Sequence, residues 1–95
     1  MELTWIDDFL ALCQTRNFTR AAETRNTTQS AYSRRIQRLE EWLGASLFFR
    51  ESRPIRLTAA GDEFHIRAVR LREDIRGLIH RSDRPETPEF GVAAQ

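Results

Sequence analysis

Several features that mark other classes of protein are scarce or missing in this chain. It has a single cysteine, Cys13, so no disulfide can form within it. The apolar neighbours of Cys13 predict a thiol in the core and a reducing environment. No apolar run is long enough to cross a bilayer, and the first 25 residues lack a basic start followed by an apolar block. We therefore expect a soluble, cytoplasmic protein that is neither exported nor membrane-bound.

Catalytic and metal-binding patterns are missing as well. The two histidines, His65 and His80, stand fifteen residues apart with no second ligand at metal spacing. No nucleophile, base and orienting residue group together, and no glycine-rich phosphate loop occurs. All fifteen basic residues are arginines, but codon preference explains the missing lysine as well as phosphate binding does, so it carries no weight. We expect no enzyme activity, no metal and no cofactor in these residues.

The size and the charge of the chain limit the kinds of protein that it can be. Ninety-five residues, of which 40% are hydrophobic, suffice for one small domain with a thin core, which often needs support from a partner chain. The net charge is only +1, but its distribution is uneven. Residues 28–58 hold six arginines against three glutamates. Basic charge therefore gathers in the middle of the chain.

The segment 28–43 is predicted to be a helix with two different faces. At about 100° per residue, one stripe is apolar and contains Tyr32, Ile36, Leu39 and Leu43. The opposite stripe is polar and contains Gln29, Ser30, Ser33, Arg34 and Gln37. Thr28 is a suitable N-cap and Gly44 a suitable terminator. Glutamine and serine can bond to a base edge, and arginine suits guanine or a phosphate, so the polar stripe predicts a helix that reads DNA.

The residues before this segment supply two more helices. Residues 3–15 place apolar side chains at helical spacing, with Asp7 and Asp8 on the solvent side. Thr19 can cap a short helix that runs to about residue 25. Residues 26–28 form a polar turn before the DNA-reading helix. This order of helix, short turn and second helix predicts a helix-turn-helix.

Residues 46–82 predict a wing and a long helix. Two strand-like pieces, residues 46–50 and 55–57, flank a polar turn with Arg53 near its tip. Thr58 can cap the helix that follows, whose apolar stripe contains Phe64, Ala68, Leu71, Ile75 and Leu78. That stripe is too narrow for a small core, so we expect this helix to pair with another one. Residues 82–89 have the composition of a linker, and residues 90–94 that of a strand.

Some residues have a plain structural interpretation beside the functional one. Trp42 is expected at the edge of the core, whereas strand alternation puts Phe49 on the solvent side. Phosphate contact is favoured for Arg34. For Arg35 and Arg38 a solvated helix face explains the charge equally well.

A set of linked motifs runs through residues 3–82 without a gap. They are Phe18-Thr19-Arg20-Ala21-Ala22, Ser33-Arg34 with Ile36, Leu39-Glu40, Leu43-Gly44, Leu47-Phe48 with Arg50, and Leu57-Thr58 with Ala60-Gly61. In this order the chain resembles the N-terminal region of the LysR-type transcriptional regulators. The resemblance implies a mainly α fold, with a winged helix-turn-helix of three helices and a two-stranded wing in residues 1–58. A long dimerisation linker helix would follow in residues 59–82, then a hinge and the start of an effector-binding domain in residues 83–95.

The resemblance also implies roles for individual residues. The base-reading positions of the family fall on Thr28, Gln29, Ser30, Ser33 and Arg34, and the polar stripe adds Gln37. The wing arginine of the family corresponds to Arg53, directed toward the minor groove, and the arginine after its Leu-Phe pair corresponds to Arg50. The family usually has proline where this chain has Ser30, so a hydroxyl replaces an apolar contact with a thymine methyl group. The dimerisation positions are those of the apolar stripe over residues 64–78.

The implied partners are double-stranded DNA with an inverted-repeat operator and a second copy of the chain. A tetramer is a further option for a full-length protein, and a small-molecule effector would bind the domain that is missing here. The alternative is a helical protein-interaction module that uses the stripe at residues 64–78 and never touches DNA. Weak, salt-sensitive binding to random duplex distinguishes the two.

Overall fold

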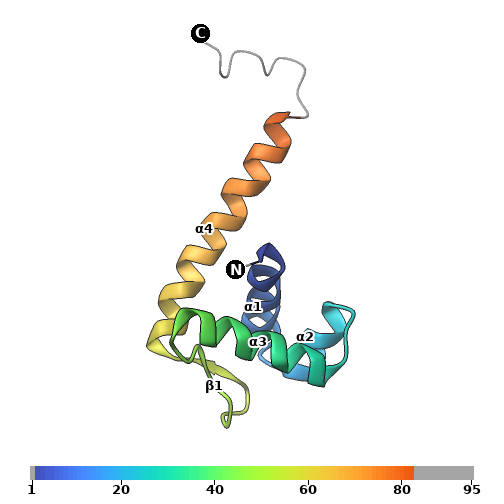
Figure 1. Ribbon diagram of the computed structural model, residues 1–95, viewed down its shortest axis with the longest axis vertical. Coiled ribbons are helices and arrows are strands. Elements are labelled where there is room, and N and C mark those ends of the chain that lie inside the picture. The colour runs from blue at the N-terminus through green and yellow to red at the C-terminus, as the bar shows by residue number, and fades with distance from the viewer. Residues whose placement is uncertain (1, 83–95) are drawn as a thin grey trace.

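The computed structural model describes residues 2–82 as three packed helices, a short hairpin and one long helix (Figure 1). The elements are α1 (Leu3–Thr15), α2 (Phe18–Thr24), α3 (Gln29–Leu43), β1 (Phe48–Phe49), β2 (Arg56–Leu57) and α4 (Ala59–Ser82). The strands pair antiparallel, with Phe48 opposite Leu57. The predicted winged helix-turn-helix followed by a long helix is confirmed. The expected hinge and strand in residues 83–95 lie outside the described residues.

The helix ends follow from local capping. Thr28 caps α3 by accepting a hydrogen bond from the backbone N–H of Ala31 at 3.2 Å, and Gly44 ends that helix with φ 75°, a conformation that glycine adopts without strain. The start of α2 differs from the prediction. Asn17, not Thr19, is its N-cap, because the Asn17 side chain accepts from the N–H of Arg20 at 3.0 Å. The hydroxyl of Thr19 is therefore available for another partner.

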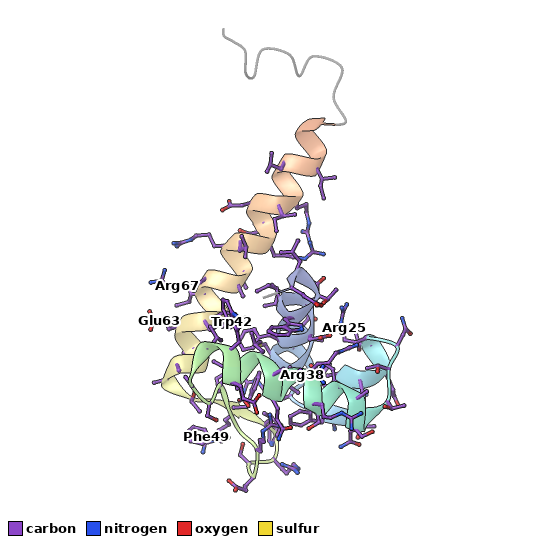
Figure 2. The ribbon with its side chains drawn as sticks, in the orientation of Figure 1. Arg25, Arg38, Trp42, Phe49, Glu63 and Arg67 are labelled. Atoms are coloured by element: carbon purple, nitrogen blue, oxygen red, sulfur yellow. The ribbon has the colours of Figure 1, made fainter. Side chains whose placement is uncertain are left out.

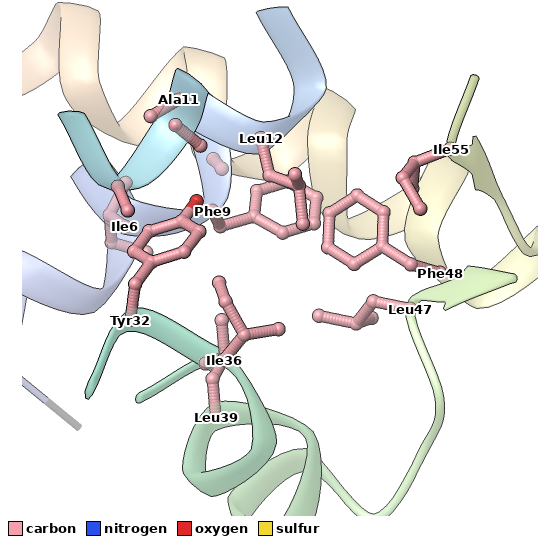
Figure 3. Packing of buried hydrophobic residues seen from close by; sticks show 13 residues of the cluster. Ile6, Phe9, Ala11, Leu12, Tyr32, Ile36, Leu39, Leu47, Phe48 and Ile55 are labelled. Atoms are coloured by element: carbon pink, nitrogen blue, oxygen red, sulfur yellow. The ribbon is translucent and has the colours of Figure 1, made fainter. Parts of the chain in front are cut away.

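One core joins the helices to the wing (Figure 3). Its largest fully buried apolar side chains come from α1, α3 and the residues next to the hairpin strands, and they are Phe9, Leu12, Tyr32, Ile36, Leu39, Leu47 and Ile55. Gly61 allows α4 to approach this core closely, because a Cβ there would lie 2.1 Å from the carbonyl oxygen of Leu47. The wing and the first turns of α4 are therefore fixed to the three-helix body.

The apolar stripe of α4 divides into a buried part and an exposed part. Ala68 is 1% exposed, and the ring of Phe64 packs edge-on to Phe9 with 4.8 Å between the centroids. Assigning Ala68 to a partner-facing surface was therefore wrong, and Phe64 is largely used inside its own chain. Leu71 is 38% exposed and Leu78 60%. The C-terminal end of α4 extends beyond the three-helix body (Figure 1). Dimerisation through this outer part stays a prediction.

Two further expectations about burial are corrected. Asp8, placed on the solvent side, is 1% exposed. Trp42, expected at the core edge, is 58% exposed. Phe49 does lie toward solvent on the wing (Figure 2), with the guanidinium of Arg56 5.1 Å above its ring. Within residues 2–82 no helix has both the length and the apolar character needed to span a membrane.

Candidate nucleic-acid interface

The outer face of α3 carries the residues predicted to read DNA. Thr28, Gln29, Ser30, Arg34 and Gln37 are exposed, and Ser33 is half-buried between them. They lie together because the opposite side of the same helix is held in the core by Tyr32, Ile36 and Leu39. The predicted two-faced helix is therefore present, with its polar face turned to solvent.

The orientation of α3 is set by a buried contact with α1. The Tyr32 hydroxyl donates a hydrogen bond to the backbone carbonyl of Asp8. Burial, with a further contribution from the Asp8 charge, raises the pKa of Tyr32 well above its usual value, so the hydroxyl stays protonated and able to donate. The polar face of α3 is thus presented from a fixed position.

An ion-pair cluster beside Tyr32 fixes the same helices. The Asp8 carboxylate lies 2.8 Å from Nε of Arg25 and 3.0 Å from Nε of Arg35. Arg35 is therefore occupied within the chain, which favours its structural interpretation over phosphate contact. This cluster was not predicted from the sequence, although Asp8 lies three residues after Trp5 and four before Leu12 and so shares their face of α1.

The wing arginines have different surroundings. Arg50 donates to Oε1 of Glu40 at 2.9 Å, and its guanidinium lies 5.1 Å from the ring centroid of Phe18. The other oxygen of Glu40 accepts from the backbone N–H of Leu47 at 2.8 Å. Arg50 therefore links α2, α3 and the wing, and a phosphate contact from it stays a prediction. Arg53 is exposed, and its Nη1 donates to the carbonyl of Ser52 at 2.8 Å.

These parts meet around a cleft of about 430 Å³ between α2, the start of α3 and the wing. Arg16, Arg20, Gln29 and Arg53 contribute to its walls, and no acidic side chain is found among its described lining residues. The cleft joins two features predicted separately, the first residue of the polar helix face and the tip of the wing. A positive cleft without acidic groups suits a polyanion.

Three contributors to this cleft were not predicted from the sequence as DNA-binding residues. Arg16 ends α1, with φ 56°, and its Nη1 lies 3.4 Å from the carbonyl oxygen of Ile55, which brings it beside the wing. Arg20 and Thr19 lie on α2. The order of motifs places α2 before α3, but only the packed structure shows which residues of α2 face the wing.

Residues 3–62 match the family described as bacterial regulatory helix-turn-helix protein, lysR family. The chain is 40% identical over 83 residues to the HTH-type transcriptional activator IlvY of Salmonella typhimurium, which covers 87% of this chain and 28% of that protein. It is 44% identical over 64 residues to IlvY of Haemophilus influenzae, covering 67% of this chain and 22% of the relative. The chain thus spans about a quarter of the length of these curated relatives.

Solved structures give the same result. The DNA-binding domain of BenM in complex with benA site 1 DNA has a TM-score of 0.84 at 35% identity, over 87% of this chain and 93% of that one. DarR of Vibrio fischeri in complex with DNA has a TM-score of 0.83 at 46% identity, over 87% of this chain and 28% of that one. Both the local motifs and the whole arrangement of helices and wing are therefore shared. The chain belongs to the LysR family of bacterial regulatory helix-turn-helix proteins.

Proposed function

We propose that this chain binds double-stranded DNA sequence-specifically, as the DNA-binding part of a LysR-type transcription regulator. The observation that carries the proposal is the cleft in which Gln29, the first residue of the exposed face of α3, meets the wing tip without an acidic residue among the described lining. An α-helix fits the major groove of B-DNA, so α3 would lie there. Arg53 would then point toward the adjacent minor groove.

The residues divide into two kinds of contact. Gln29 and Ser33 carry groups that bond to base edges and would read sequence, with Arg34 available to guanine or to a phosphate. Arg20 borders the same cleft as Gln29 and would hold the backbone, whereas Arg53, which also borders it, would reach the minor groove. Ser30, exposed beside Gln29, would offer a hydroxyl where the family usually has a proline.

A second copy of the chain would complete the DNA-binding unit. The exposed part of α4 presents Leu71 and, one turn on, the half-buried Ile75, on a helix that projects from the body (Figure 1). Pairing two such helices would bury this apolar surface and present two reading helices to an inverted repeat. In a full regulator, working in the cytoplasm, a small-molecule effector would bind a separate domain.

Binding-site selection tests this proposal. The 95-residue chain would be used to select sites from a random duplex pool, and the affinity for the selected site and for random duplex would then be measured over a range of salt concentrations. We expect tight binding to an inverted repeat and weak, salt-sensitive binding to random duplex, because phosphate contacts release counterions. A chain that binds no duplex even at low salt would favour a protein-interaction module.

A further inference from the structure

One hydrogen bond connects the side chains of α2 and α3 at the cleft. The Thr19 hydroxyl donates to Oε1 of Gln29, with 3.0 Å between the oxygens. Among the described residues, it is the only side-chain to side-chain hydrogen bond between these two helices. Thr19 also lines the cleft beside Gln29, so the contact lies where the proposed DNA surface begins.

This contact contributes little to the stability of the fold. Both side chains are exposed, and an exposed hydrogen bond exchanges with water at almost no net gain. Within residues 2–82, no other protein group bonds to either of the two side chains. The contact does, however, restrict a long side chain that would otherwise sample many rotamers.

The backbones on both sides are fixed, so the restriction is effective. Asn17 caps α2 two residues before Thr19, and Ala21 and Ala22 are buried against the neighbouring helices. Thr28 caps α3 immediately before Gln29. The two helix starts therefore keep a constant separation, and the hydroxyl can hold the amide in one orientation.

The orientation determines what Gln29 offers to a base. A glutamine amide has an acceptor end, Oε1, and a donor end, Nε2, which carries two hydrogens. Thr19 engages one of the two lone pairs of Oε1, which holds this end of the amide toward α2, and the donor end has no protein partner in the described part of the chain. In the major groove, purine N7, guanine O6 and thymine O4 accept hydrogen bonds, whereas the cytosine amino group donates.

We propose that Thr19 is a positioning residue for base readout, which fixes the Gln29 amide so that it presents N–H groups to an acceptor-bearing base. This inference rests on the proposed function and adds a specificity determinant outside the reading helix. It also gives a direction of preference. At the base position contacted by Gln29, a purine or thymine edge is favoured over the cytosine edge.

The test uses three substitutions on α2 in the full 95-residue chain. Thr19→Val removes the hydroxyl and keeps the branched shape, whereas Thr19→Ser keeps the hydroxyl. Thr24→Val is the matched control, because Thr24 is another exposed α2 threonine whose hydroxyl, within residues 2–82, bonds only to the Arg20 carbonyl, at 3.0 Å. Gln29→Ala first identifies the base position at which discrimination is lost. Affinities are then measured for random duplex and for four versions of the selected site, one with each base pair at that position.

We expect Thr19→Val to reduce discrimination at that position about fivefold to tenfold, without changing the affinity for random duplex or the unfolding midpoint. Thr19→Ser should retain discrimination, and Thr24→Val should behave as wild type. In a Gln29→Ala background, Thr19→Val should have no further effect, because the amide it positions is gone. The side-chain amide NMR signals of Gln29 in the DNA-free protein should broaden or shift in Thr19→Val and not in Thr24→Val.

Other results would overturn the inference in distinguishable ways. If Thr19→Val weakens binding to the selected duplex and to random duplex equally, the hydroxyl contacts a phosphate. The same loss in the Gln29→Ala background would mean that Thr19 acts independently of Gln29, and a preference for the cytosine edge would mean that the amide is held the other way round. Normal DNA binding with unchanged discrimination in Thr19→Val would overturn this role alone, whereas a wild-type chain that binds no duplex would overturn the proposed function.

Discussion

The Asp8 carboxylate contacts the Arg35 guanidinium through two atom pairs, with Nη2 donating to Oδ1 at 3.1 Å and Nε lying 3.0 Å from Oδ2. The first contact is a hydrogen bond. The second is a close ion pair that is not aligned as a hydrogen bond, because neither Nε of Arg35 nor Oδ2 of Asp8 has a hydrogen-bond partner among the described residues. Arg25 donates to the same Oδ1 at 2.8 Å. One buried carboxylate thus holds the proposed reading helix against α1.

Asp8→Asn should destabilise the fold. The amide keeps the shape but removes the charge that two arginines share, and we expect a loss of about 2 kcal/mol in the free energy of unfolding, measured by urea denaturation. The arginines keep some exposure, 27% for Arg25 and 35% for Arg35, which limits the loss.

The neighbouring carboxylate provides the matched control. Asp7 pairs with Arg72 at 2.9 Å, but the two side chains are 31% and 39% exposed, respectively. Asp7→Asn should cost less than about 1 kcal/mol, because water screens an exposed ion pair. Equal losses for the two variants would show that burial of Asp8 does not govern the strength of its cluster.

Gln29→Ala and Ser33→Ala test base readout. Each should weaken binding to the selected site by about 1–3 kcal/mol and leave binding to random duplex almost unchanged, because a base contact is lost and phosphate contacts remain. Gln14→Ala, which removes an exposed glutamine from α1, should change neither affinity. Fluorescence anisotropy at fixed salt gives both values, and an equal loss on selected and random duplex would remove these residues from the reading face.

Arg53→Ala tests the wing. Arginine is attracted to the narrow minor groove of A·T tracts, so wild type should prefer sites with A·T flanks over G·C flanks, and the substitution should reduce that ratio. Arg67→Ala provides the control, since Arg67 lies on α4 beside Glu63 (Figure 2). An unchanged flank ratio in Arg53→Ala would exclude the wing tip from readout.

The fold was predictable from the sequence where local chemistry determines it. The stripe of Tyr32, Ile36 and Leu39 and the caps at Thr28 and Gly44 define α3 before any tertiary contact is known. Periodicity shows that a face is apolar but does not show what covers it. For this reason Ala68, on the same stripe as Leu71, was assigned to a partner although the chain's own core covers it.

The candidate site was predictable only in part. Side-chain type identifies Gln29 and Arg53 as candidates, but their meeting at one cleft depends on how the wing packs on the helices. Asp8 was missed because a charged residue is assigned to solvent unless its partners are known, and Arg25 and Arg35 come from other helices. The Thr19–Gln29 contact likewise requires the packing of two helices.

Cys13 should give the stability of the protein a dependence on alkaline pH. Burial raises the pKa of the Cys13 thiol from 9.0 to about 12, so the folded state favours the protonated form. The stabilisation from this shift is complete below the unfolded pKa and is lost as pH rises toward 12. The free energy of unfolding of wild type relative to Cys13→Ala should be constant up to about pH 8, then fall by up to about 1.4 kcal/mol per pH unit. Urea denaturation at pH 7 to 11 gives this difference, and a flat difference would contradict the shift.

The outer part of α4 is expected to hold two chains together. Leu71→Arg with Ile75→Arg should convert a dimer into monomers and greatly weaken operator binding, because the charges occupy the surface on which the two long helices would pair. Ile66→Arg provides the control, since Ile66 is 61% exposed on another face of α4 and should leave the dimer intact. Ala68→Arg should unfold the domain instead, because Ala68 lies in the core. Sedimentation equilibrium distinguishes these outcomes, and a monomeric wild-type chain at micromolar concentration would exclude pairing through this surface.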